Sequence, residues 1–174
     1  SLKKGGSGLF LGDSVITNLH VVEEQGIGAE SCVVSLPVDS ETATASTQDI
    51  HTFESNLDAA AITIRNPTSF MKSISDTKRQ VCVDTPPVGA KVVVLGYPSI
   101  GSPTDITATD GIVSGYDGDY YITDAKIEHG NSGGVALWVE KGCNLGIPTS
   151  ATVGTIESLG RILDFRVLFS RLAK

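Results

Sequence analysis

Short apolar segments separated by turn residues recur along most of the chain. Leu9–Leu11 and Val15–Thr17 flank the pair Gly12–Asp13, a sequence that favours a tight hairpin turn. Strands at such short intervals, each bounded by turn signals, predict an all-β sandwich or barrel. The further predicted strands are Cys32–Leu36, Ala59–Ile64, Lys91–Gly96, Gly111–Ser114, Tyr120–Thr123, Gly134–Val139 and Leu145–Val153.

Three segments depart from this strand pattern. Asn66–Val88 has little periodicity and is expected to connect two β halves, with Gln80–Val83 as a candidate further strand. Ser40–Thr47 is a low-complexity patch that predicts a surface loop. Helical spacing of apolar residues is confined to Val167–Leu172, which predicts one short C-terminal helix.

Length, composition and charge exclude several kinds of protein for this chain. The 174 residues, with 40% hydrophobic and 19% charged positions, suffice for a buried core in one domain or in two small lobes. No apolar run approaches the roughly 18 residues that a membrane span requires. The net charge is −7 and the basic residues are scattered, which argues against nucleic acid and anionic membranes as partners.

The cysteines and histidines indicate no metal site. Cys32, Cys82 and Cys143 are odd in number and far apart, a pattern that fits neither a disulfide framework nor a zinc site. Because free cysteines are usually buried, we expect three buried thiols. We predict no metal and no cofactor. The first residue is Ser1 rather than Met, which leaves open whether a targeting segment was removed upstream.

The densest candidate for chemistry is the segment 129–134, His-Gly-Asn-Ser-Gly-Gly. A nucleophilic serine needs a tight turn whose backbone N–H groups point at a developing oxyanion. Glycines on both sides of Ser132 permit such a turn and let a substrate approach. By itself the segment is equally compatible with an ordinary turn.

A serine nucleophile also needs a base and a carboxylate that orients the base. His20 lies at the end of the apolar strand that starts at Val15, and Asp58 opens the apolar segment that runs to Ile64. Taken singly, His20 could be a core histidine and Asp58 a strand-end cap. Together with Ser132 they occur in the order His, Asp, Ser, which is the chain order of chymotrypsin-like proteases.

The surrounding segments resemble the HtrA-type trypsin-like serine proteases over nearly the whole chain and in the same order. The similarity is carried by Gly6–Phe10, Val15–Val22, Asp58–Ile64, Val88–Val92, Leu95–Pro98, Gly111–Ser114, Thr123–Gly134 and Gly160–Leu172.

This resemblance implies two antiparallel six-stranded β-barrels with the active site in the cleft between them and a short C-terminal helix. The expected organisation is a single protease domain over residues 1–174. Its N-terminal barrel is expected at about 1–75, its C-terminal barrel at about 80–165 and its helix at about 166–173.

The resemblance also implies residue roles. Ser132 would be the nucleophile of a serine endopeptidase that forms an acyl-enzyme, His20 the general base and then acid, and Asp58 the orienting carboxylate. The oxyanion hole would lie at Gly130, Asn131 and Ser132 and use the N–H groups of Gly130 and Ser132. The expected partner is a polypeptide substrate, the expected state a monomer unless missing segments drive oligomerisation, and the suggested location extracytoplasmic.

Substrate binding follows less clearly from the resemblance. Lys126 falls where trypsin-like enzymes place the floor of the specificity pocket. One interpretation is that Lys126, with His129, favours an acidic side chain before the scissile bond. The other is that Lys126 faces solvent and the pocket accepts small aliphatic side chains. The segment 147–150 is expected to pair with the substrate backbone, although Pro148 lacks a donor. The candidate substrate-binding residues are Lys126, Ile127, His129, Ile147, Pro148 and Thr149.

Rival functions have weaker support. Gly12-Asp13-Ser14 is similar to the start of SGNH-type esterases, but that family needs a late histidine, and none follows His129. A cysteine protease on the same fold would carry Cys in place of Ser132. The remaining alternative is a catalytically silent peptide-binding or scaffold domain that keeps the protease fold.

Overall fold

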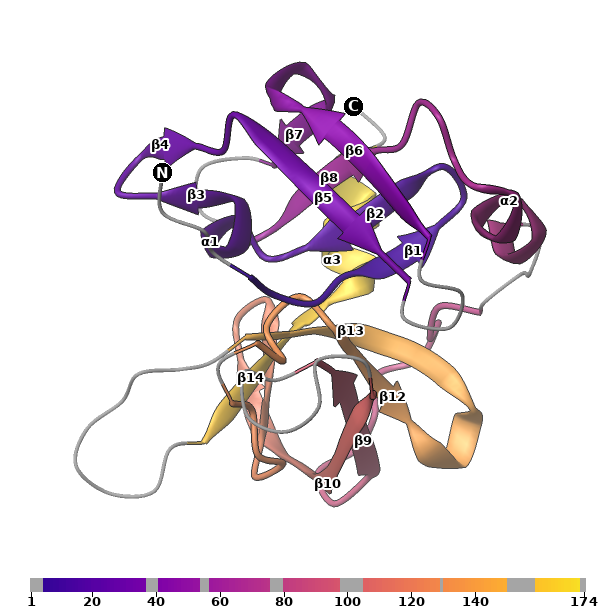
Figure 1. Cartoon of the computed structure of the whole chain (residues 1–174). Coiled ribbons are helices and arrows are strands. Elements are labelled where there is room, and N and C mark those ends of the chain that lie inside the picture. The colour runs from indigo at the N-terminus through magenta and orange to yellow at the C-terminus, as the bar shows by residue number, and fades with distance from the viewer. Residues whose placement is uncertain are drawn as a thin grey trace.

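A computed structural model describes residues 5–36, 41–53, 57–75, 80–97, 105–128, 130–149 and 159–172 of the chain. Strands dominate, and they form two β-rich halves. Figure 1 shows the indigo-to-purple strands of the first half above the strands of the second half, with the yellow helix α3 reaching up from β14.

The first half is built from an open sheet and two hairpins. The sheet has the order β1-β2-β8-β7, and its hairpin turn at Gly12 has φ of 63°, as the Gly-Asp pair predicts. The remaining strands pair as β3 with β4 and β5 with β6. The elements are β1 (Leu9–Leu11), β2 (Ser14–Thr17), α1 (Leu19–Val22), β3 (Glu23–Glu24), β4 (Ile27–Gly28), β5 (Ser31–Ser35), β6 (Thr42–Ser46), η1 (Thr47–Asp49), β7 (Ile50–Thr52), β8 (Ala60–Thr63) and α2 (Ser69–Ser75).

The second half is a closed antiparallel barrel of six strands in the order β10-β11-β14-β13-β12-β9. Alternate residues of each strand point inward, so that Val92, Val94, Val113 and Ile162 are fully buried in one apolar core. The elements are β9 (Lys91–Gly96), β10 (Thr107–Asp117), β11 (Tyr120–Thr123), β12 (Val135–Trp138), η2 (Val139–Lys141), β13 (Cys143–Thr149), β14 (Gly160–Asp164) and α3 (Phe165–Leu172).

Helix α3 contributes to the contact between the two halves. Its residues Phe165 and Leu168 are fully buried in an apolar cluster that also holds Leu57 of the first half and Ile147 of the second. Burial of such side chains contributes about 1.5–3 kcal/mol each. The halves therefore share a continuous apolar interface. Within the described residues, no helix has the length and apolar character that a membrane crossing would demand.

The fold agrees with the predicted mostly-β class and the short C-terminal helix. The six-stranded closure is confirmed for the second half. In the first half, the described strand pairings make a four-stranded sheet and separate hairpins, so a second closed barrel stays a prediction. The proposed domain boundaries likewise stay predictions.

Two predictions about local structure were wrong. The patch at 40–47 is not a loop throughout, because Thr42–Ser46 forms β6 with Ala43 and Ala45 buried. Alternation of Thr with Ala has the strand period, and alanine is apolar enough to face a core. Helix is also not confined to the C-terminus, since α2 lies in the segment expected to be irregular and buries Met71 completely.

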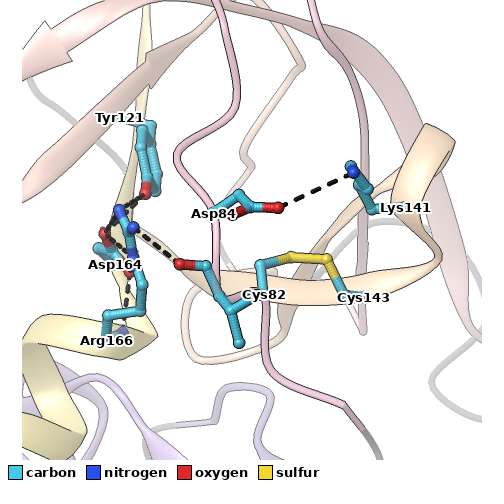
Figure 2. Close-up of a disulfide and its surroundings, with 8 residues drawn as sticks. Cys82, Asp84, Tyr121, Lys141, Cys143, Asp164 and Arg166 are labelled. Carbon is cyan, nitrogen blue, oxygen red and sulfur yellow. Dashed lines mark hydrogen bonds and ion pairs between the residues drawn. A yellow bond between two sulfur atoms is a disulfide. The ribbon is translucent and has the colours of Figure 1, made fainter.

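The prediction of three buried thiols was also wrong. Cys82 and Cys143 form a disulfide, which leaves Cys32 as a free cysteine among the described residues. Next to the disulfide, Val81 forms an isolated parallel bridge with Asn144, so the candidate strand at Gln80–Val83 is reduced to a single bridge. The bridge and the disulfide, of which Figure 2 shows the disulfide, attach the segment between the halves to β13.

A cluster of Arg166, Asp164 and Tyr121 also contacts the segment between the halves, on the side away from the disulfide (Figure 2). Arg166 donates to the Asp164 carboxylate at 2.7 Å, to the hydroxyl of Tyr121 at 2.7 Å and to the Thr85 hydroxyl at 2.9 Å. It also donates to the backbone carbonyl of Val83 at 3.3 Å. Burial, together with the Asp164 carboxylate, raises the pKa of Tyr121 above its ordinary value. The cluster is therefore a neutral phenol between a carboxylate and a guanidinium.

Candidate active site

The geometry of the first sheet brings His20 and Asp58 together. Strands β2 and β8 are antiparallel, with Thr17 opposite Ala60. The residues that follow β2 and those that precede β8 therefore lie at the same end of this strand pair. His20 Nδ1 lies 2.7 Å from Asp58 Oδ2, and the His20 backbone N–H donates to Asp58 Oδ1 at 3.0 Å. The Asn18 side chain donates to the Asp58 carbonyl oxygen at 2.8 Å. The pair is therefore held by both backbone and side-chain contacts.

The barrel half supplies a further partner to Asp58. The Thr149 hydroxyl, at the end of β13, donates to Asp58 Oδ2 at 2.8 Å. Burial opposes the negative charge of Asp58, but the hydrogen bonds from His20 and Thr149 and the nearby imidazole lower the pKa of this carboxyl below its ordinary value. An ionised carboxylate can only accept hydrogen bonds. Nδ1 of His20 is therefore the donor in this contact.

Ser132 lies in a turn that requires glycine. The Asn131 N–H donates to the Glu128 carbonyl at 3.0 Å, and Gly130, the residue before Asn131, has φ of 99°. A positive φ at the third residue of a hydrogen-bonded turn favours glycine. Gly133 has φ of 85° on the other side of Ser132. Ser132 itself is only 4% exposed.

This serine turn packs directly against the segment that leads to His20. A Cβ added to Gly133 would lie 2.2 Å from the Thr17 hydroxyl oxygen and 3.2 Å from the Asn18 backbone nitrogen. The Gly133 N–H also donates to the Pro148 carbonyl at 3.3 Å, one residue before Thr149. Within the described residues, no hydrogen bond joins the Ser132 hydroxyl to His20. The structure thus brings His20 and Asp58 into contact and sets the serine turn beside their elements.

Two backbone donors of the turn are available. In the described part of the chain, the N–H groups of Asn131, Gly133 and Gly134 donate to backbone carbonyls, whereas those of Gly130 and Ser132 do not. Unpaired N–H groups flanking a serine are what an oxyanion hole requires. They are the two N–H groups that the resemblance implies for an oxyanion hole, and that role stays a prediction.

The predicted substrate-binding residues are distributed around the turn. Lys126 is exposed, and Ile127 packs against the barrel core beside Gly160, where an added Cβ would lie 2.4 Å from the Ile127 side chain. Ile147 and Pro148 are buried in β13. His129 and residue 150 lie outside the described residues. Their roles in substrate binding stay predictions.

Several contacts of the candidate site were not anticipated from the sequence. Thr149 was expected to bind substrate, yet its hydroxyl contacts Asp58. Asn18 and Ser7 also contact the site, and nothing in their local sequence marks them, because the pairing of distant strands creates these contacts. Among the described residues, no group of three or more His, Cys, Asp or Glu side chains is arranged to hold a metal.

Comparisons with known proteins place the chain among peptidases. The family described as trypsin-like peptidase domain matches residues 6–147. The serine endoprotease from Yersinia pestis has a similar structure, with a TM-score of 0.75 and 24% sequence identity. The match covers 99% of this chain and 58% of that protein. No curated protein sequence matches the chain.

Proposed function

The chain belongs to the family of trypsin-like peptidase domains, and we propose that it is an HtrA-type serine endopeptidase that hydrolyses peptide bonds in polypeptides. One observation carries this proposal. His20 Nδ1 lies 2.7 Å from Oδ2 of Asp58, whose pKa is lowered, and both lie next to the glycine-rich turn around Ser132, where among the described residues the N–H groups of Gly130 and Ser132 have no hydrogen-bond partner.

The proposed reaction uses each of these groups in turn. His20 Nε2 removes the Ser132 hydroxyl proton as Oγ attacks the scissile carbonyl carbon. The N–H groups of Gly130 and Ser132 stabilise the oxyanion of the tetrahedral intermediate. His20 then gives its proton to the leaving amine, and an acyl-enzyme remains on Ser132. Water, deprotonated by His20, attacks the acyl carbon, and the proton returns to Ser132 Oγ as the acid product leaves. Asp58 stays ionised throughout and stabilises the imidazolium.

The Cys82–Cys143 disulfide supports the proposal of an extracytoplasmic location. Disulfides persist in oxidising compartments and are rare in the cytosol. For the same proposed enzyme we retain the expectation of a monomer.

Labelling with a fluorophosphonate tests the function. Intact-mass measurement is expected to show one adduct on the wild-type chain and none on Ser132→Ala. Ser35→Ala, which removes an exposed hydroxyl of β5, is the matched control and should label normally. An adduct that persists in Ser132→Ala would contradict the assigned nucleophile. No adduct on the wild type would favour the catalytically silent scaffold.

A peptide library tests the specificity. If Lys126 contributes to the pocket, cleavage should prefer an acidic residue before the scissile bond, and Lys126→Ala should remove that preference. If Lys126 only faces solvent, small aliphatic residues should be preferred in both proteins.

A further inference from the structure

Ser7, just before β1, is buried and uses all of its polar groups. Its hydroxyl donates to the Gly130 carbonyl at 2.5 Å and accepts from the Tyr97 N–H at 2.7 Å. Its backbone N–H donates to the Ser132 carbonyl at 3.1 Å, and its own carbonyl accepts from the Thr17 hydroxyl at 2.7 Å. This one residue, 4% exposed, connects the first half, the end of β9 and the serine turn.

The Ser7 hydroxyl holds one end of a peptide plane whose other end is held by Glu128. The carbonyl of Gly130 receives the Ser7 hydrogen bond, and the N–H of the same peptide, from Asn131, donates to the Glu128 carbonyl at 3.0 Å. A peptide unit is planar, so fixing both of its polar ends fixes its orientation. Gly130 is conformationally permissive, which makes this restraint necessary. The orientation of this plane in turn limits the positions of the Gly130 and Ser132 donors on either side.

The side chain of Asn131 does not provide this restraint. It is fully buried, yet neither its oxygen nor its nitrogen has a hydrogen-bond partner within the described part of the chain. Gly96 gives room for the arrangement, because a Cβ there would lie 3.0 Å from the Ser7 hydroxyl oxygen and 2.9 Å from Asn131 Oδ1. Among the described residues, the hydroxyl of Ser7 is therefore the side-chain group that holds the turn.

We propose that Ser7 is a positioning residue that keeps the oxyanion-hole turn in its working shape. This inference rests on the proposed function, because it assigns Ser7 a role in the reaction at Ser132. Ser7 touches neither substrate nor the reacting atoms. It acts through the Gly130–Asn131 peptide.

Three variants test the proposal in the full chain. Ser7→Ala removes the hydroxyl, Ser7→Thr retains it, and Ser46→Ala removes a comparable serine hydrogen bond, to Asp49 at 2.7 Å, in the first half. The measurements are kcat and KM for a cleaved peptide, inhibition by a peptide aldehyde, and hydrogen exchange of the Tyr97 amide. The aldehyde forms a tetrahedral adduct and so reports on the oxyanion hole.

Ser7→Ala is expected to lower kcat by about 10- to 100-fold, with KM changed less than about twofold, the range typical of lost orienting contacts. Aldehyde affinity should fall by a similar factor, and the Tyr97 amide should lose protection. Ser7→Thr should stay within about threefold of the wild-type kcat. Ser46→Ala should lower thermal stability and leave kcat unchanged. If Ser7→Ala does not fold, Ser7→Cys, whose thiol is a weak donor, should lower kcat in the same direction.

Two results would overturn the proposal. One is a folded Ser7→Ala or Ser7→Cys protein with wild-type kcat and aldehyde affinity. The other is a fall in kcat that Ser46→Ala reproduces. Failure of the proposed function looks different. The wild type would then take no phosphonate label, while Tyr97 protection would still report the hydrogen bond between Tyr97 and the Ser7 hydroxyl.

Discussion

Both halves of the molecule consist mainly of short antiparallel strands, but different contacts stabilise each half. The second half closes into a six-stranded barrel, and a disulfide and the Arg166 cluster fasten the preceding segment to it. In the first half, the described pairings leave an open sheet and separate hairpins. A closed barrel has no free edge, whereas an open sheet depends on what packs against it.

The candidate site draws on both halves. His20 and Asp58 belong to the open half, and Ser132 and Thr149 to the barrel. Their alignment therefore depends on hydrogen bonds that cross between the halves, such as Thr149 to Asp58 and Ser7 to Gly130. The comparison teaches that the residues of the candidate site come together only when the two halves pack against each other.

The largest expected effect comes from Asp58, where the two halves meet. Asp58→Asn should lower kcat by about 10⁴-fold, because the amide stabilises the wrong histidine tautomer and no longer balances the imidazolium. Steady-state kinetics with a peptide substrate measures this effect. An Asp58→Asn protein within tenfold of the wild type would contradict the role assigned to the pair.

Breaking the disulfide should destabilise the barrel half. Closing a loop between residues 61 apart restricts the unfolded chain by about 4 kcal/mol. In urea unfolding, the free energy of unfolding of Cys82→Ser/Cys143→Ser, or of the reduced wild type, should fall by about this amount. Cys32→Ser is the matched control in the open half. Its thiol is half-buried, which raises its pKa, but it forms no disulfide. An equal loss in Cys32→Ser would remove the contrast between the halves.

Two Asp–Arg pairs, one taken from each half, should differ in the same sense. Arg166→Ala leaves the buried Asp164 and the Tyr121 hydroxyl without their cation, and should cost about 2–3 kcal/mol of stability. In the open half, Arg65 is 60% exposed where it pairs with Asp49, so Arg65→Ala should cost clearly less. Chemical denaturation of both variants measures the difference, and equal losses would contradict it.

The smallest effect concerns acid stability of the open half. Hydrogen bonds from the Ser46 side chain and backbone and from Arg65 lower the pKa of Asp49 from 3.8 to about 2. Because the folded-state pKa is the lower one, this stabilisation is present above about pH 4 and is lost as the pH falls towards 2. Asp49→Asn should therefore lose less stability than the wild type between pH 4 and pH 2. Urea unfolding at several pH values measures this, and parallel curves would contradict it.

Local pattern predicted the strands best where a short apolar run is bounded by turn residues. Lys91–Gly96 and Tyr120–Thr123 form strands with the predicted bounds. β6 was missed because its inward residues are alanines in a polar segment, and α2 because a short helix carries too few apolar positions to show a period. The disulfide was missed because Cys82 and Cys143 become neighbours only when the segment between the halves lies along β13.

The sequence by itself determined the features that depend on near neighbours. These are the strands formed by short apolar runs, the turn at Gly12, the glycines around Ser132, and the order of His20, Asp58 and Ser132 along the chain. Tertiary structure alone decided which distant groups meet, such as Thr149 with Asp58 and Ser7 with Gly130, residues 91 and 123 positions apart. Local preferences act over a few residues, whereas such contacts depend on strand register, barrel closure and the packing of one half against the other.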